Sequence, residues 1–224
     1  MRAELAVREA LVRARTRFIN VAKALVRRDG LRVRRSTAEN VAERISELPL
    51  SATLTAELAP LLALLAPLTA QIAAADARIA RLGQMDPAVA LLATAPGIGP
   101  ITASAVVAIG DDITRFASAP QFEAYLGLVP GERSSGEKRQ VAHITKAGNR
   151  RARYLLVEAA WRIVRSRTAE TAALRTWALR IALHRGKRIA VVARARRLAG
   201  ILYPMWRDGR AYNAAQLRSP LMTD

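Results

Sequence analysis

Residues 54–82, with the sequence LTAELAPLLALLAPLTAQIAAADARIARL, carry the most regular apolar pattern of the chain. The apolar positions follow alternating steps of four and three residues: Leu54, Leu58, Leu61, Leu65, Leu68, Ile72, Ala75, Ile79 and Leu82. This spacing is typical of the buried seam of a coiled coil. It predicts a helix that pairs with a folded-back segment of the chain or with a second copy; a long helix on a globular core has the same pattern.

Two prolines, Pro60 and Pro67, interrupt this seam. A proline inside a helix removes one backbone hydrogen bond, and its ring clashes with the preceding turn. We therefore expect a helix that is kinked, or one that begins near Pro67.

The segment before the seam predicts two further helices. Residues 2–28 place apolar side chains at helical spacing between arginines, which indicates an amphipathic basic helix that ends near Asp29 and Gly30. Ser36 stands three residues before Glu39, a pattern typical of a capping box, and predicts a second, short helix that closes before Pro49.

After the seam, Asp86 and Pro87 predict the start of a short apolar helix. The turn Pro96–Pro100 follows, with Gly97 and Gly99 on either side of an apolar residue, as in helix-hairpin-helix elements of DNA-binding proteins. Glycines let a backbone approach a phosphate, and the N-terminus of the next helix can bind it. A helix–helix turn that only packs is the alternative.

Residues 131–139 form a polar, basic loop that contains Ser134 and Ser135. A serine that attacks phosphorus needs a free hydroxyl and nearby cations, although a solvated surface loop has the same composition. Asn149 is the predicted N-cap of the next helix. Cations in that helix's first turn oppose the helix dipole, which favours an anion bound there. The candidate nucleic-acid-binding residues of this region are Arg133, Lys138, Arg139, Lys146, Asn149, Arg150, Arg151 and Arg153.

The last third of the chain is basic, with no Asp or Glu from Thr171 to Arg207. Its cations predict a long basic surface: Arg175, Arg180, Arg185, Lys187, Arg188, Arg194, Arg196, Arg197 and Arg207. Residues 190–202 are expected to form a core helix that residues 203–206 close, and the residues from 211 onward are expected to be a flexible tail.

Composition narrows the possible partners. The chain has 36 Lys and Arg against 18 Asp and Glu, a formal net charge of +18 on 224 residues. A polyanion relieves this self-repulsion, so charge alone leaves nucleic acid and an anionic membrane surface as partners. Only 4% of the residues are aromatic, which argues against recognition of single strands by base stacking.

Metal binding and export are not expected. The chain has no cysteine and two separated histidines, His143 and His184, so we expect no metal or other cofactor bound wholly by this chain. Glu4 and Glu9 interrupt the N-terminal segment, which has no continuous apolar core and fails as a signal peptide. These features predict a cytoplasmic protein. No membrane partner is expected, because binding to a membrane surface would leave the turn from Gly97 to Pro100 without a purpose.

The sequence therefore predicts a mainly α fold with a long helical, coiled-coil-like N-terminal part and a compact helical domain that contains the helix-hairpin-helix-like element. The expected boundaries are basic helices and seam at 1–85, a second domain at 86–210 and a flexible tail at 211–224.

Three blocks of the second domain resemble a known family. LLATAPGIGPITASAVVAIGDDITRF (91–116), QFEAYLGLVPGERSSGEKR (121–139) and ITKAGNRRARYLLVEAAW (144–161) are similar, in order and spacing, to the C-terminal transposase domain of insertion-sequence family 110, which is related to Piv-type DNA invertases. The segment LVRARTRFINVAKALVRRDGL (11–31) resembles the helical part that follows the family's first domain, so the resemblance covers about residues 5–210.

The resemblance implies a site-specific recombinase with two halves. An N-terminal RuvC-like domain would hold magnesium through acidic residues, and a serine of the C-terminal domain would attack a DNA phosphate. The matching serine is Ser135, with Ser134 as the alternative. The implied partners are duplex DNA, a structured guide RNA and a further copy of the chain.

The sequence departs from the family at its N-terminus, because it begins where the RuvC-like domain is expected to have ended. Magnesium is accordingly expected only in that other domain, and the chain alone is expected to lack strand-exchange activity. The alternative function is that of a non-catalytic nucleic-acid-binding helical protein, which the same charge and periodicity also predict.

Overall fold

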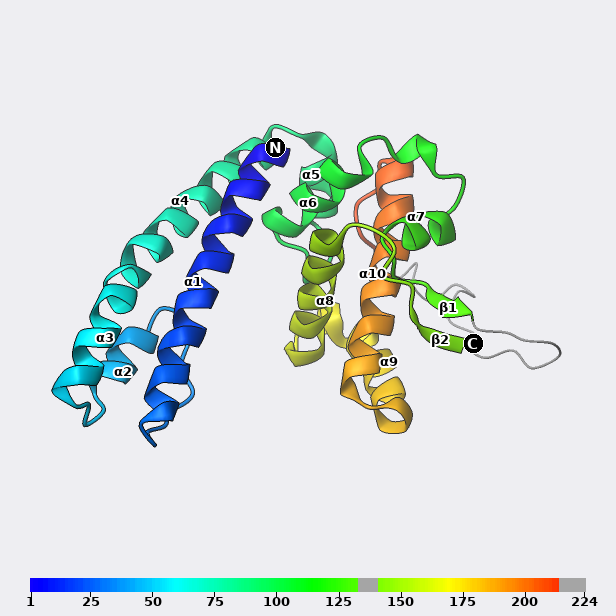
Figure 1. The fold of residues 1–224 in the computed structure, drawn as a ribbon. Coiled ribbons are helices and arrows are strands. Elements are labelled where there is room, and N and C mark those ends of the chain that lie inside the picture. The colour runs from blue at the N-terminus through cyan, green and yellow to red at the C-terminus, as the bar shows by residue number, and fades with distance from the viewer. Residues whose placement is uncertain (133–140, 214–224) are drawn as a thin grey trace. The chain divides into compact units, whose positions relative to one another are not determined.

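The computed structural model describes residues 1–132 and 141–213, and in these ranges the chain is mainly α-helical, as predicted (Figure 1). The helices are α1 (Arg2–Arg28), α2 (Val41–Ser46), α3 (Ala52–Ala63), α4 (Leu65–Gln84), α5 (Pro87–Leu92), α6 (Pro100–Gly110), α7 (Ala119–Tyr125), α8 (Arg150–Arg165), α9 (Ala169–Arg185) and α10 (Lys187–Asp208). A 3-10 turn, η1 (Ile113–Arg115), and two antiparallel strands, β1 (Pro130–Glu132) and β2 (Val141–Ile144), join them.

The chain divides into two compact units. Unit 1 is residues 1–81 and unit 2 is residues 82–224, whereas the sequence placed the division after residue 85.

Unit 1 buries the predicted seam against α1. Leu54, Leu58 and Leu65 pack in one apolar cluster with Ala22 and Val26 of α1. The seam thus finds its partner within the chain, as a folded-back segment. The seam forms two helices, α3 and α4, because the helix is interrupted at Leu64, between the two prolines. Pro60 lies inside α3. A coiled-coil geometry and a dimer through this seam stay predictions.

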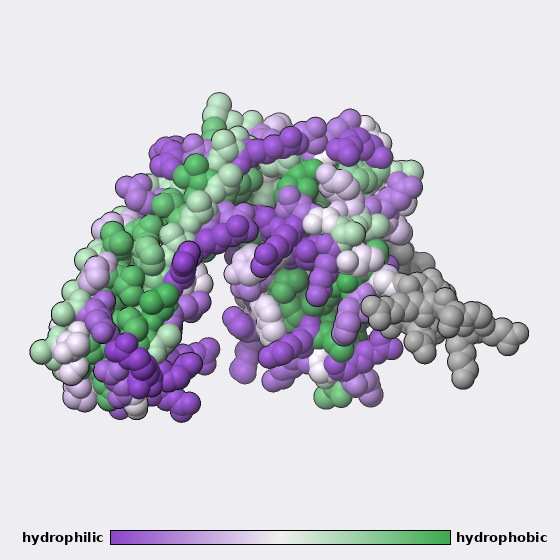
Figure 2. Space-filling view, in the orientation of Figure 1, coloured by the Kyte–Doolittle hydropathy of each residue, from purple (hydrophilic) through white to green (hydrophobic). Residues whose placement is uncertain are grey.

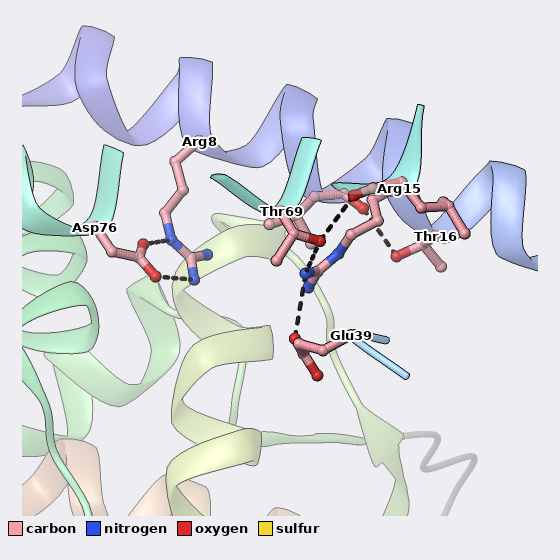
Figure 3. Close-up of polar contacts among 8 residues, drawn as sticks. Arg8, Arg15, Thr16, Glu39, Thr69 and Asp76 are labelled. Carbon is pink, nitrogen blue, oxygen red and sulfur yellow. Dashed lines mark hydrogen bonds and ion pairs between the residues drawn. The ribbon is translucent and has the colours of Figure 1, made fainter. Parts of the chain in front are cut away.

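Polar contacts fix the pairing of α1 with the seam helices (Figure 3). Arg8 pairs with Asp76, and Arg15 donates to the Thr69 hydroxyl at 3.1 Å. At the two ends of α1, Arg78 binds Glu4 at 3.1 Å, and Arg28 binds Glu57 at 2.8 Å. The partner numbers fall as those of α1 rise, so α1 runs antiparallel to α3 and α4.

The predicted start of the second helix was wrong. α2 begins at Val41 after Asn40, and Ser36 lies outside it. Leu31 and Val33 of the preceding segment pack against the unit 1 core, which holds that segment in a non-helical conformation up to Asn40.

One stretch, Ala52–Gln84, is long and apolar enough to cross a membrane by length and composition. The helix is interrupted at Leu64, and Asp76 and Arg78 form ion pairs with α1. Both features favour a role of this stretch in the packing of unit 1.

Unit 2 is organised around α10, which packs against α5, α7, α8 and α9. Its core contains an aromatic cluster in which Phe122 contacts Phe116, Tyr203 and Trp206. The buried Tyr203 hydroxyl donates to the Phe116 carbonyl at 2.6 Å. These contacts hold the helix together beyond the predicted end at residue 202, so that α10 includes Pro204 and ends only at Gly209.

Candidate nucleic-acid interface

The strands β1 and β2 form the base of the loop that carries the candidate serines. Pro130 pairs with Ile144, and Glu132 pairs with Val141. The described residues on either side of 133–140, Glu132 and Val141, are thus paired with each other. The predicted residues Arg133, Ser134, Ser135, Lys138 and Arg139 lie outside the described residues.

Two backbone hydrogen bonds join the segment after β2 to the segment before β1. The Thr145 amide donates to the Val129 carbonyl at 2.9 Å, and the Lys146 amide donates to the Gly127 carbonyl at 3.2 Å. Gly127 has a φ of +67°, and a Cβ atom on it would lie 2.8 Å from the Ala147 carbonyl oxygen. A Cβ on Gly148 would collide with the backbone of Tyr125. Only glycine fits at these two positions, so the base of the hairpin has a fixed geometry.

The N-terminus of α8 follows this segment directly. Asn149 is its N-cap, as predicted: the side-chain oxygen accepts hydrogen bonds from the amides of Arg151 at 2.9 Å and Ala152 at 3.1 Å. Because the cap already binds these two amides, an anion at this end would be held chiefly by side-chain cations. The nucleic-acid-binding role of Asn149 itself stays a prediction.

The predicted cations at this end differ in exposure. Lys146 and Arg150 are exposed, while Arg151 and Arg153 are half-buried. Arg153 donates to the Leu126 carbonyl at 3.1 Å and so ties α8 to the turn after α7. Lys146 and Arg150 are therefore the described cations best placed to meet a phosphate, and Arg153 has a structural contact of its own.

Gly97 and Gly99 lie in the turn between α5 and α6. Gly97 has a φ of +75°, and a Cβ on it would lie 2.8 Å from Ile163 Cγ1 and 3.0 Å from the Ala159 carbonyl oxygen. The close approach of α8 thus requires this glycine. Gly99 is the N-cap of α6, and a Cβ there would lie 3.7 Å from a guanidinium nitrogen of the exposed Arg162. Phosphate binding by this helix-hairpin-helix-like turn stays a prediction.

The candidate residues therefore form two groups along α8. Lys146 and Arg150 lie at its N-terminus, whereas Gly97 and Gly99 contact it near Ala159–Ile163. Twelve residues of helix separate Arg150 from Arg162, a distance of about 18 Å. A single phosphate cannot contact both groups.

The predicted basic surface of the last third was partly wrong. Arg194 is fully buried, and its guanidinium lies 4.6 Å from the centre of the Trp177 ring, with Arg197 at 5.0 Å from the same ring. Burial, and then the charge of Arg197, lower the pKa of Arg194 to about 9. Arg196 pairs with the buried Glu123 at 2.6 Å. These arginines belong to the packing of α10.

Possible metal-ligating side chains do not cluster in the described part of the chain. Within residues 1–132 and 141–213 no group of three or more His, Cys, Asp or Glu side chains is placed to hold a metal ion. The acidic side chains instead act in ion pairs and helix caps, such as Asp86, whose carboxylate accepts from the amides of Ala88 and Val89.

Comparisons with known proteins agree on one family. Residues 89–175 match the model of the transposase IS116/IS110/IS902 family. A probable family 20 transposase of Pseudomonas aeruginosa is 35% identical over 207 residues, which are 89% of this chain and 61% of the relative. The transposase for insertion sequence element IS1111A of Coxiella burnetii is 32% identical over 214 residues, 92% of this chain and 58% of the relative.

A more distant relative is the uncharacterized 43.6 kDa protein of insertion element IS110 from Streptomyces coelicolor, 27% identical over 139 residues, which are 62% of this chain and 34% of the relative. The chain thus spans less than two thirds of the length of these relatives.

Proposed function

Because residues 89–175 of this chain belong to the IS116/IS110/IS902 family of transposases, we propose that it acts in the transposition of an insertion sequence through a serine nucleophile, Ser135, that attacks a DNA phosphate. Ser134 is the alternative nucleophile. The chain then belongs to the DNA transposases as an enzyme class, and duplex DNA is its substrate.

The observation that carries the proposal is the position of the hairpin base. The paired residues Glu132 and Val141 hold both ends of the serine loop, and β2 leads through the turn at residues 145–148 into the N-terminus of α8. Exposed Lys146 and Arg150 follow within nine residues of the loop's end at Val141. We expect the serine between these strands to attack a phosphate that these cations attract.

The chemistry is a transfer of the phosphoryl group between oxygens. The serine Oγ loses its proton and forms a bond to phosphorus, while the bond from phosphorus to a deoxyribose oxygen breaks and that oxygen gains a proton. Lys146 and Arg150 would stabilise the charge that develops on the non-bridging phosphate oxygens. Strand exchange is completed when a second DNA hydroxyl displaces the serine.

Within the described residues, no group of three or more His, Cys, Asp or Glu side chains is placed to hold a magnesium ion. We propose that the ion, where the family uses it, is held by a RuvC-like domain that acts with this segment, in keeping with the greater length of the relatives. A structured guide RNA, a second copy of the chain and a cytoplasmic location belong to the same proposal.

The test is the capture of a covalent protein–DNA adduct in an active complex. The complex contains this chain, a RuvC-like domain of the family supplied by fusion or in trans, and the cognate RNA. We expect an adduct on denaturing gels that the Ser135→Ala variant does not form, with a DNA dissociation constant changed by only a few-fold, since one neutral hydrogen bond contributes about 1 kcal/mol.

The neighbouring serine is the matched control. Loss of the adduct with Ser134→Ala, and not with Ser135→Ala, would move the nucleophile by one residue and leave the mechanism intact. An active complex in which both variants exchange strands normally rules out the serine mechanism, and DNA binding without any adduct favours the non-catalytic alternative.

A further inference from the structure

The junction of α9 and α10 exposes two large apolar side chains at one tip of unit 2. The helices meet at Gly186, whose φ of +81° allows the chain to reverse (Figure 1). Leu183 is 83% exposed and Ile189 is 52% exposed, on either side of this glycine. Leu183 ties with Met85 as the most exposed of the large apolar side chains in the described segments.

The tip is also strongly basic. Its exposed side chains include Arg180, His184, Arg185, Lys187 and Arg188. In the part of the chain that the structure describes, none of these has a carboxylate partner, and the sequence has no Asp or Glu from residue 171 to 207. On the visible face of unit 2, hydrophilic side chains surround smaller hydrophobic areas (Figure 2).

Buried residues of α9 and α10 hold the backbone of the tip in place. Leu174 and Ala178 of α9 and Val191 and Ala195 of α10 are buried between the two helices and the rest of unit 2. The Arg175 guanidinium adds a hydrogen bond of 3.2 Å to the Val164 carbonyl. A partner that binds the tip therefore meets a backbone that packing already holds in place, so little backbone ordering opposes the contact.

Charge decides between the partners that an apolar tip can have. A second copy of the chain also carries a formal charge of +18, so two tips would repel each other. A polyanion with apolar surface between its charges fits both features, and duplex DNA is such a partner: its phosphates flank stacked bases that an apolar side chain can enter.

We propose that the α9–α10 tip is a wedge that inserts Leu183 between base pairs of duplex DNA, with Ile189 beside it and Arg185, Lys187 and Arg188 on the flanking phosphates. The inference rests on the DNA-binding part of the proposed function and goes beyond it. The wedge partly unstacks one base step, untwists the duplex there and bends it.

The experiment measures untwisting without knowledge of the binding site. Relaxed plasmid is incubated with the full chain, treated with topoisomerase I and freed of protein, and its linking number is read on a gel. We expect a reduced linking number that grows with bound protein. In Leu183→Ser/Ile189→Ser, this change should fall by more than half at equal occupancy, while the dissociation constant stays within about threefold because the cations remain. Leu183→Phe should retain the change in linking number.

The control variant removes two exposed apolar side chains from unit 1. Val7 is 49% exposed and Leu64 is 47% exposed. Val7→Ser/Leu64→Ser should leave the linking-number change intact. Circular dichroism checks that all variants are folded.

The remaining outcomes overturn the wedge. DNA binding with no change in linking number, or a change that survives in Leu183→Ser/Ile189→Ser, refutes it and leaves the proposed function standing. No DNA binding at all refutes both. Flotation with phosphatidylserine vesicles that depends on Leu183 and Ile189, with no effect of the two residues on plasmid, would assign the tip to a membrane surface.

Discussion

Unit 1 and unit 2 use arginine in opposite ways. In unit 1, Arg8, Arg28 and Arg78 on or against α1 pair with carboxylates of other segments of the same unit. In unit 2, Arg194 and Arg197 stack on Trp177, Arg165 lies 5.2 Å from the Trp161 ring, and the cations of the α9–α10 tip have no described carboxylate partner. Ion pairs between segments far apart in sequence thus join the helices of unit 1, whereas the described arginine–ring contacts lie in unit 2, which also has the Arg196–Glu123 pair.

The difference assigns separate tasks to the two units. In unit 1, ion pairs of α1 with α3 and with α4 fix the register of the antiparallel helices. The exposed cations of unit 2 lie on the part of the chain that matches the transposase family and continue into α9 and α10. The polyanion that the net charge of +18 calls for should therefore bind mainly unit 2.

The largest effect is expected from a charge in the seam. Leu65 is buried in the unit 1 core, and Leu65→Asp would place a carboxylate there without a partner, at a cost of about 4 kcal/mol. Hydrogen exchange on the full chain should then show lost protection in α1, α3 and α4, with α8 and α10 unchanged. The neighbouring Leu64→Asp, at an exposed site, is the control. Equal loss of protection in both units would show that they do not fold separately.

A smaller effect of opposite sign is expected at Arg194. This guanidinium is buried with no hydrogen-bond partner among the described residues. The cation–π contact with Trp177 contributes about 2 kcal/mol, whereas burial of an ion costs several. Arg194→Met keeps most of the volume and removes the charge, so it should raise the free energy of unfolding by about 1 to 2 kcal/mol. Hydrogen exchange of the slowest α10 amides measures this free energy of unfolding. A lower value in Arg194→Met would show that the stacked cation stabilises the fold.

The same substitution in unit 1 should destabilise the protein. Arg8→Met leaves Asp76 without its partner at a partly exposed site, which costs about 0.5 to 1 kcal/mol. A double-mutant cycle with Asp76→Asn, read from the exchange of α1 and α4 amides, isolates the pair. A coupling energy of zero would remove the ion pairs as the reason for the antiparallel register.

The sequence predicted the elements whose signal is local. The extent of α1, the buried seam and the Asn149 cap all follow from spacing or from one side chain beside its own backbone. The interruption of the helix at Leu64 agrees with the predicted kink or helix start near Pro67, but its exact position did not follow from the sequence, because each proline acts on its own turn. Ser36 does not cap a helix, because Leu31 and Val33 of its segment pack against the unit 1 core. The local sequence pattern does not contain this tertiary contact.

Arg194 was missed although a signal was present. It lies four residues after Ala190 and four before Leu198, on the buried stripe of α10. Periodicity alone could have marked it as buried, but the residue type suggested a surface position. Its ring partner, Trp177, is on another helix, so the contact that makes burial tolerable depends on tertiary structure.

The salt dependence of DNA binding tests most directly whether unit 2 carries the contacts. With roughly six phosphates contacted, the log–log slope should be about −5. Lys146→Asn/Arg150→Gln removes two exposed cations beside the serine loop and should make the slope shallower by about 1.8. Arg28→Gln/Arg44→Gln removes two cations that are paired with Glu57 and Glu47 in unit 1, and should leave the slope unchanged. A slope that responds to the unit 1 variant and not to Lys146→Asn/Arg150→Gln would contradict the account.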